Sequence, residues 1–196
     1  MYIFELRSPK KRKMKAKYLE RRGFYNPKQV NTGRYSFHFE VEVEDEDLKK
    51  TIRRCKRRRL TYFYYDKQFA RAANYRKRFF DAYEPPYRCR YCNKRLKEST
   101  VTVDHLIPVD AAKKSPKVQR LIINSGLNGV NDIKNLVPSC PKCNCRKGNK
   151  MGLWYLRGRL GSSKAYWRIR RLIKTAFLAA VIYLFCYTVY SLSLII

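Results

Sequence analysis

The chain has 196 residues, of which 45 are Lys or Arg and 15 are Asp or Glu, so its formal net charge at pH 7 is +30. This length allows one full domain, or one small domain with appended segments. Charge of this size repels itself unless a polyanion neutralises it, which favours a nucleic-acid partner and makes an anionic membrane surface the second alternative. Aromatic residues make up 14% of the chain, and rings interleaved with cations suit base stacking.

Cysteine usage favours a reducing compartment. The sequence contains seven cysteines, which alone would suit a secreted disulfide scaffold. However, residues 1–7 include no long apolar stretch, so we expect no signal peptide. Seven is an odd number, and four of the cysteines have the spacing of zinc ligands. Reduced thiols are therefore the better interpretation.

The N-terminal part is rich in cations and contains one clear strand pattern. Residues 7–22 form a basic run, which we interpret as an arm contacting nucleic acid rather than as a nuclear import signal. From Arg34 to Glu44 apolar and polar residues alternate strictly, which predicts a half-buried strand. His38 falls on the polar side with the glutamates, so we expect a surface histidine rather than a ligand.

Two helices are expected before the first cysteine pair. The carboxylates of residues 44–47 favour a helix N-terminus, and the six cations within Thr51–Arg59 fit a basic helical face. Tyr62–Tyr83 mixes aromatic residues with cations, and we predict helix there too, ended by the prolines at 85–86. The proline pair separates a basic N-terminal region from the module that follows.

Four cysteines in two close pairs form the most specific pattern in the chain. Cys89 and Cys92 make the first pair, and Cys140 and Cys143 make the second. Four thiolates at this spacing predict a closed tetrahedral zinc site, which is structural because no coordination position remains for water. Such a site would bring together segments that are distant in the sequence.

The polar residues that could carry chemistry lie between and just after these pairs. Residues 101–103 predict a β-branched strand that ends at Asp104 and His105. Residues 135–138 predict a second short strand, and a helix is expected after it with Asn144 in its first turns. Histidine titrates near neutrality, as a general base must, and an adjacent carboxylate can hold a cation at a phosphate.

These residues resemble the HNH endonuclease family, in particular its zinc-stapled subtype with the ββα-metal fold. The motif of that subtype runs C-x2-C, then D-H-x-x-P, then N-L-x-x-x-C-x-x-C-N-x-x-K. Many relatives have His as the last letter of the HNH triplet, but the amide oxygen of Asn144 can also bind a hard cation. The sequence supplies the motif residues in order: Cys89, Cys92, Asp104, His105, Pro108, Asn135, Leu136, Cys140, Cys143, Asn144 and Lys147.

The resemblance implies a metal-dependent nuclease site. His105 would be the general base that deprotonates the attacking water, and Asp104 and Asn144 would bind one Mg²⁺ or similar divalent cation. That cation would contact the scissile phosphate and stabilise charge on the leaving 3′ oxygen. Asn135 would belong to the site with a mainly structural part, and the four cysteines would hold the zinc.

Several residues of the module keep a second interpretation. His105 can instead be a buried histidine or one beside the zinc, although the adjacent acid and Asn144 favour catalysis. Lys147 and Lys150 either neutralise substrate phosphates or lie on a solvated helix face. Residues 111–126 are an insertion relative to the compact family form, and we expect a short helix there. The remaining cysteines are interpreted as bystanders: Cys55, Cys145 and Cys186.

The C-terminal segment is the second distinctive feature. Its 22 residues, Thr175–Ile196, carry no charge and are almost wholly apolar, and a helix of that length can cross a hydrocarbon core of about 30 Å. Cations at 168–174 and aromatics at 166–167 precede it, which predicts a tail anchor with the basic body on the cytoplasmic side. The alternative is a buried C-terminal helix or strand pair. Gly158 and residues 161–163 predict a short linker before the tail.

These patterns together predict an α+β fold: a small ββα-metal nuclease module with a four-cysteine structural zinc, preceded by a basic α/β region and followed by an apolar helix. The expected ranges are 1–84 for the nucleic-acid-contacting region, 86–152 for the module, 153–171 for a basic linker and 172–196 for a transmembrane helix. The expected partner is DNA, contacted through its backbone phosphates. A zinc-ribbon protein that binds nucleic acid without cleaving it is the main alternative, and a membrane-tethered structural protein is a third.

Overall fold

A computed structural model describes residues 1–7, 15–32 and 35–193, so the cations of 8–14 and Arg34 of the expected strand lie outside the described residues. The chain forms two compact units. The sheet unit comprises Met1–Ala82 and Ile107–Leu136, and the cysteine unit comprises Tyr83–Leu106 and Val137–Ile196. Both mix helices and strands, which confirms the α+β class. The units are defined by packing alone, and the domain ranges expected from the sequence stay a prediction.

The sheet unit is built on a four-stranded antiparallel sheet with the strand order β2-β3-β1-β4. Its strands are β1 (Tyr2–Arg7), β2 (Lys28–Thr32), β3 (Tyr35–Val43) and β4 (Thr61–Asp66). β3 confirms the strand predicted from the alternating pattern. The sequence pattern did not indicate β1, whose residues from Ile3 to Leu6 are all buried because this inner strand is covered on both faces.

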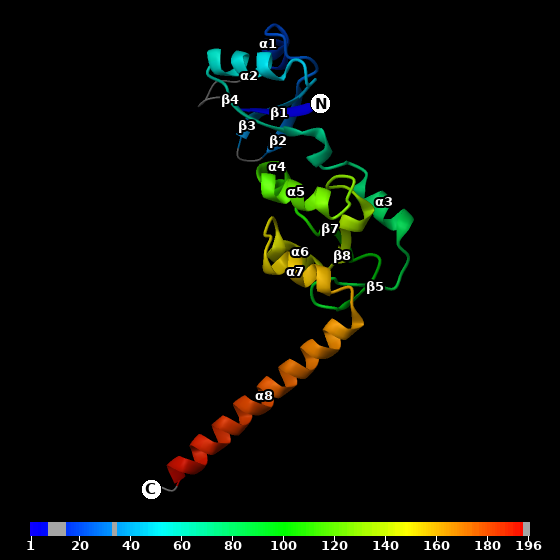
Figure 1. Cartoon of the computed structure of the whole chain (residues 1–196), viewed down its shortest axis with the longest axis vertical. Helices are drawn as coiled ribbons and strands as arrows, with labels where there is room; N and C mark the ends of the chain where they lie inside the picture. The colour runs from blue at the N-terminus through cyan, green and yellow to red at the C-terminus, as the bar shows by residue number, and fades with distance from the viewer. Residues whose placement is uncertain (8–14, 33–34, 194–196) are drawn as a thin grey trace. The chain divides into compact units, whose positions relative to one another are not determined.

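One face of the sheet packs against α1 (Ala16–Glu20) and α2 (Leu48–Arg57), which Figure 1 shows on the same side of the strands. The helix α2 follows the acidic residues 44–47 and ends in cations, which confirms the predicted basic helix. Cys55 is fully buried here, and burial raises the pKa of its thiol to about 11, which fits a bystander. The core between helices and sheet contains Phe4, Leu6, Leu19, Phe24, Phe39, Val41, Val43, Cys55 and Leu60.

The opposite face is covered by α4 (Val109–Lys114), which is followed by α5 (Pro116–Asn124). The expected insertion at 111–126 therefore contains most of two helices rather than one. Lys113 of α4 reaches down to the sheet, where its Nζ lies 3.2 Å from Glu5 Oε1 and 4.1 Å from the centre of the Tyr65 ring. This face therefore buries charged groups as well as apolar ones.

His38 lies on this second face, so the prediction of a surface histidine is wrong. The residue is 5% exposed, and its Nε2 lies 3.6 Å from Glu5 Oε2. The polar side of β3 is therefore covered at His38, whereas Glu42 on the same side is exposed. Glu5, His38 and Glu40 are close enough to one another to hold a metal ion. Arg7 and Lys113 already compensate the carboxylate charge of Glu5, however.

The helix predicted for Tyr62–Tyr83 is wrong over its first part. Residues 61–66 form β4, an edge strand that pairs along the whole length of β1. Its run of Tyr and Phe has high strand propensity, and pairing with β1 realises that preference. A short 3-10 helix, η1 (Lys67–Phe69), follows, and α3 (Tyr75–Ala82) ends before the prolines as expected. A second 3-10 helix, η2 (Ile133–Asn135), closes the unit.

The cysteine unit begins with two short strand pairs and the helix α6, before its two C-terminal helices. β5 (Tyr87–Arg88) and β6 (Arg95–Leu96) form a hairpin, and β7 (Thr102–His105) pairs with β8 (Leu136–Ser139). α6 (Pro141–Lys147) follows β8 and contacts β7. Two strands and a helix confirm the predicted outline of the module. The helix begins before Cys143 because the Sγ of Cys140 accepts the Cys143 N–H as an N-terminal cap.

The C-terminal part is helical almost throughout. α7 (Leu153–Leu160) includes Gly158, so the expected linker is reduced to residues 161–163 before α8 (Lys164–Ser193). α8 contains a segment long and apolar enough to cross a membrane, and none of that segment is buried; Figure 1 shows it as one continuous helix. The alternative of a buried helix is therefore wrong for the described residues, while 194–196 lie outside them.

Candidate active site and metal centre

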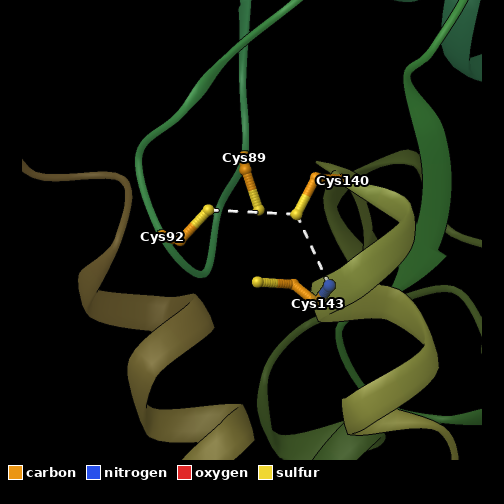
Figure 2. Close-up of side chains that lie close together, drawn as sticks. All are labelled: Cys89, Cys92, Cys140 and Cys143. Carbon is orange, nitrogen blue, oxygen red and sulfur yellow. Dashed lines mark hydrogen bonds between the residues drawn. The ribbon is translucent and has the colours of Figure 1, made fainter.

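Four cysteine sulfurs gather in the cysteine unit, as Figure 2 shows. All four Sγ atoms lie within 4.8 Å of one another, and those of Cys92 and Cys140 are 3.9 Å apart. A tetrahedral zinc ion with Zn–S bonds of about 2.3 Å separates its sulfurs by about 3.8 Å. This four-cysteine group could therefore hold a structural zinc ion. Cys145 is exposed and does not belong to the group.

The backbone shapes this sulfur cluster before any metal binds. The Lys94 carbonyl accepts the Cys89 N–H at 2.9 Å, and the Asn93 N–H returns to the Cys89 carbonyl at 2.8 Å. The Arg90 N–H joins the hairpin to β8 through the Pro138 carbonyl at 2.8 Å. Burial raises the pKa of the Cys89 thiol to about 11. Zinc binding at neutral pH must therefore expel a proton from this thiol.

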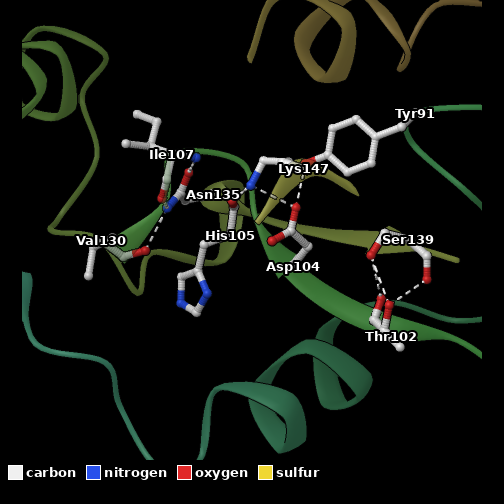
Figure 3. Close-up of polar contacts among 9 residues, drawn as sticks. All are labelled: Tyr91, Thr102, Asp104, His105, Ile107, Val130, Asn135, Ser139 and Lys147. Carbon is white, nitrogen blue, oxygen red and sulfur yellow. Dashed lines mark hydrogen bonds and ion pairs between the residues drawn. The ribbon is translucent and has the colours of Figure 1, made fainter. Parts of the chain in front are cut away.

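Asp104 is held from two sides at the end of β7 (Figure 3). The Tyr91 hydroxyl donates to Asp104 Oδ2 at 2.6 Å, and Lys147 Nζ lies 2.9 Å from the same oxygen. The other oxygen, Oδ1, contacts none of the residues drawn in Figure 3. Burial and the charge of Asp104 raise the pKa of Tyr91, so its phenol stays a proton donor at neutral pH. These contacts fix one carboxylate oxygen and leave the second for another ligand.

Lys147 is completely buried, so neither interpretation made from the sequence is right. Its Nζ bridges Asp104 and the carbonyl oxygen of His105, the latter at 2.8 Å. An ammonium group can be buried only when it is paired in this way. Lys147 is therefore a structural cation that joins α6 to the end of β7, and it does not meet substrate. Lys150, by contrast, is exposed.

His105 is 3% exposed and ends β7. Its carbonyl binds Lys147, while Figure 3 shows its imidazole turned away from that lysine. The residue is outside the four-cysteine group, so it is not a zinc ligand. Its burial is compatible with both remaining interpretations, a structural buried histidine and a catalytic base. The residues around His105 decide between them.

Asn144 lies half-buried on α6, three residues before Lys147. Residues three apart share one face of a helix, and Lys147 on this face points to β7. The turn that carries Lys147 to Asp104 therefore places Asn144 on the side of α6 that faces the strand. The sequence places Cys143 directly before it, so the zinc cluster and the amide share one helical turn.

Asn135 belongs to the sheet unit and is 1% exposed. Its Oδ1 accepts the Ile107 N–H at 2.8 Å, and its Nδ2 donates to the carbonyls of Ile107 and Val130 at 3.2 and 2.7 Å (Figure 3). The amide therefore uses both its oxygen and its nitrogen within the protein. An amide whose oxygen and nitrogen are both hydrogen-bonded to the backbone is typical of a residue that holds neighbouring chain segments in place.

Two features of this site were not predicted from the sequence. One is Tyr91, and the other is the burial of Lys147 against Asp104. A signal for Lys147 was present, because it lies four residues after Cys143 and three after Asn144, on the face that must carry the metal cluster. No comparable signal existed for Tyr91. Its place inside the first cysteine pair suggested only a spacer, and its hydroxyl is directed to Asp104 by the hairpin fold.

A family model described as HNH endonuclease matches residues 89–150. No curated protein matches the chain. The matched segment contains both cysteine pairs as well as Asp104, His105, Asn135 and Asn144, which confirms the resemblance predicted from the motif.

Proposed function

We propose, from the premise that residues 89–150 carry an HNH endonuclease module, that this protein is a metal-dependent endonuclease that hydrolyses phosphodiester bonds of DNA. One observation carries the proposal beyond family likeness. A fully buried lysine and a phenol hold Asp104 by a single oxygen, directly beside His105 in the chain. A zinc ribbon that only binds nucleic acid has no need to fix a carboxylate in this way.

The donor set fits a hard divalent cation. Asp104 Oδ1 and the amide oxygen of Asn144 are both oxygen ligands, and Mg²⁺ is commonly bound by one or two protein oxygens with water completing its shell. When bound, such an ion supplies positive charge at the scissile phosphate and at the leaving 3′ oxygen. Lys147 contributes by occupying Oδ2, which fixes the orientation of Asp104.

His105 acts as the general base in this proposal. Its imidazole removes a proton from the water that attacks the phosphorus, the P–O3′ bond breaks, and the leaving 3′ oxygen takes a proton from solvent water, which gives 5′ phosphate and 3′ hydroxyl ends. Lys147 binds the His105 carbonyl and so sets where the ring lies. Asn135 acts as a positioning residue, since its amide is fully used in holding Ile107 and Val130.

DNA is the proposed substrate because the net charge of +30 requires a polyanion. The exposed cations that end α2, Lys56 to Arg59, are suited to backbone phosphates. Contacts of this type release counterions, so binding should weaken steeply as the salt concentration rises.

A plasmid-nicking assay with Mg²⁺ or Mn²⁺ tests the proposal. Wild type should nick, and His105→Ala should lose about 10²–10⁴-fold in rate, the usual contribution of a general base. Asn144→Ala should lose activity that higher metal concentrations partly restore. Asn124→Ala, at the exposed end of α5, is the matched control and should keep full activity.

Two results would contradict the proposal. The first is equal nicking by wild type and His105→Ala. The second is DNA binding by the zinc-loaded wild type with no cleavage across several divalent ions, which would identify the zinc-ribbon alternative. Zinc content and circular dichroism of each variant separate lost chemistry from lost folding.

We also propose that α8 anchors the protein in a membrane with the basic body on the cytoplasmic side. The supporting observation is the exposure of its large apolar side chains, such as Phe177, Leu184 and Phe185. A soluble protein rarely exposes so much contiguous apolar surface. The cations of 168–174 would remain inside by the positive-inside rule. Complete release by alkaline carbonate would refute the anchor.

A further inference from the structure

A basic cavity of about 890 Å³ lies in the cysteine unit, away from Asp104 and His105. It is formed by the first cysteine hairpin, the end of α7 and the first turns of α8. Nine of its fifteen lining residues are Lys or Arg and none is acidic. Arg88, Arg90 and Lys94 lie on the hairpin beside the cysteines, where a zinc ion with four thiolates carries two net negative charges. The two negative charges can offset only part of the positive charge of the lining, so the cations of α7 and α8 keep the cavity positively charged.

The walls of this cavity are fixed by specific contacts. The Trp167 Nε1–H donates to the Gly161 carbonyl at 3.0 Å, and a Cβ added at Gly161 would collide with the Arg90 carbonyl oxygen. This close approach, which only glycine allows, joins the start of α8 to the cysteine hairpin. The Arg170 guanidinium lies 5.6 Å from the Trp167 ring centre. The cavity is therefore a structured feature of the fold.

One wall residue lacks an acceptor. Arg157 Nε is buried and has no hydrogen-bond partner among the described residues. Buried donors in folded proteins are nearly always paired. Arg157 also lines the cavity, and a guanidinium is well suited to bind a phosphate there.

We propose that this cavity binds the phosphate headgroup of an anionic phospholipid, an inference that rests on the membrane insertion of α8 proposed above. The cations Arg168, Arg170, Arg171 and Lys174 line the cavity and directly precede the uncharged residues from Thr175 onward. At about 1.5 Å per residue they span about 10 Å along the helix, comparable to the headgroup layer on one side of a bilayer.

Lipid is favoured over nucleic acid by this position. With α8 inserted, the cations of its first turns lie at headgroup depth, where lipid phosphates are already concentrated and a DNA backbone is not. The indole of Trp167 also suits this layer, since tryptophan is enriched at membrane interfaces. Basic residues next to a membrane helix attract anionic lipids of the cytoplasmic leaflet by the same electrostatics.

Lipid-selective quenching of Trp167 tests the proposal. The full chain, carrying Trp154→Phe so that Trp167 is the single tryptophan, is reconstituted in phosphatidylcholine vesicles. Spin-labelled phosphatidylglycerol or spin-labelled phosphatidylcholine is then added at equal fractions. We expect the anionic lipid to associate about tenfold more strongly. The triple variant Arg157→Gln, Arg168→Gln, Arg171→Gln should reduce this preference to about twofold or less.

The matched control removes the same charge elsewhere. Lys114→Gln, Lys117→Gln, Arg120→Gln neutralises three exposed cations of the sheet unit and should leave the preference unchanged. Equal quenching by both lipids in the parent chain overturns the proposal, as does quenching by neither, which would mean that Trp167 is not at a membrane. A preference that both triple variants reduce equally reflects net charge and also overturns it.

Nucleic acid is tested in the same vesicles. If a short duplex DNA abolishes the lipid preference, and the cavity variant loses DNA affinity when the control variant does not, the cavity is a nucleic-acid site and the lipid proposal fails. The nicking assay separates this outcome from the nuclease proposal. A His105→Ala chain without nuclease activity should retain the full lipid preference.

Discussion

Each unit of the protein contains a lysine with little exposed surface that reaches from a helix to a carboxylate on a strand. In the sheet unit Lys113 pairs with Glu5 at 3.2 Å, and in the cysteine unit Lys147 pairs with Asp104 at 2.9 Å. A tyrosine completes both groups. The Tyr65 ring lies under Lys113, and the Tyr91 hydroxyl donates to Asp104. Lysine, carboxylate and tyrosine thus form a similar group in both units, although the two groups have different roles.

The surroundings decide which carboxylate can do chemistry. Glu5 is paired additionally by Arg7 and lies near His38, so cations surround it. Asp104 ends its strand, has one oxygen outside the contacts of Figure 3, and directly precedes His105. A buried Lys–carboxylate–Tyr group is therefore a structural device by itself. It becomes part of a site only where the strand ends and leaves an oxygen available.

Metal removal should separate the two groups most strongly. α6 carries both Cys143 and Lys147, so loss of zinc should release the helix and the Lys147–Asp104 pair together. Structural zinc contributes on the order of 10 kcal/mol to folding in small domains at neutral pH. Hydrogen exchange should show lost protection in β5, β6, β7, β8 and α6 after chelation, with β1 to β4, α4 and α5 still protected. Acidification should release zinc similarly, because thiolates are the ligands.

The matched pair for this prediction is Cys143→Ser and Cys145→Ser. The first removes a sulfur of the four-cysteine group, and the second changes an exposed cysteine two residues later that lies outside it. Zinc analysis should find one ion per chain in Cys145→Ser and none in Cys143→Ser. Equal zinc retention in both would show that the four sulfurs do not form the metal site.

Lys147→Met should have the next largest effect. It removes a fully buried ammonium and leaves Asp104, whose side chain is 11% exposed, without its ion partner. Breaking one half of a buried pair costs about 3–5 kcal/mol of unfolding free energy. Because Asp104 also loses its orientation, nicking should fall by about 10–100-fold, as is usual for groups that orient a metal ligand. Denaturant melts and the nicking assay measure the two effects.

Lys150→Met provides the control, since this lysine is exposed on the turn after α6. It should change stability by less than about 0.5 kcal/mol. Loss of activity in Lys150→Met but not in Lys147→Met would restore the interpretation of these lysines as substrate contacts and would remove the structural assignment of Lys147.

Some residues of the two groups could be predicted from the sequence, and others could not. Both cysteine pairs, the Asp104-His105 step and Asn144 have fixed spacings, because a tetrahedral metal accepts few arrangements of its ligands. They could therefore be found without a structure. His38 could not be placed, because alternation shows which residues share a face of a strand but not whether a helix covers that face. The later helix α4 covers this face of the sheet at β4 and Glu5, from a distant part of the chain.

The prediction of a helix for the aromatic run at 61–66 was wrong for a related reason. Its rings, followed by cations from Lys67 onward, fit a helix as well as a strand, and only the pairing with β1 selects the strand. β1 itself was missed because an inner strand buried on both faces has no alternating pattern. Lys147 and Lys113 share this difficulty, since a lysine appears solvated in sequence until its partner is known.

Lys113→Met should destabilise the protein less than Lys147→Met, by about 2–3 kcal/mol, below the range for a fully buried pair. Lys113 and Glu5 keep side-chain exposures of 14% and 12%. Arg7 also remains near Glu5 and shares its charge. Nicking should be unaffected at temperatures where the variant is folded. A loss of activity without unfolding would show that the sheet unit takes part in the chemistry.

The smallest effects should come from removing single hydroxyls. Tyr91→Phe deletes the 2.6 Å hydrogen bond to Asp104, which should cost about 1.5 kcal/mol, at the lower end for bonds to charged groups because Lys147 still satisfies the same oxygen. Tyr65→Phe removes the phenol oxygen of the tyrosine under Lys113 in the sheet unit and is the matched control, with a smaller expected cost. The two variants should differ in activity. With one of its two anchors gone, Asp104 can rotate about its side chain, so Tyr91→Phe should need a higher divalent-cation concentration for half-maximal nicking, while Tyr65→Phe should match wild type. An equal metal requirement for all three proteins would mean that Lys147 alone orients Asp104 and that the phenol contributes only to stability.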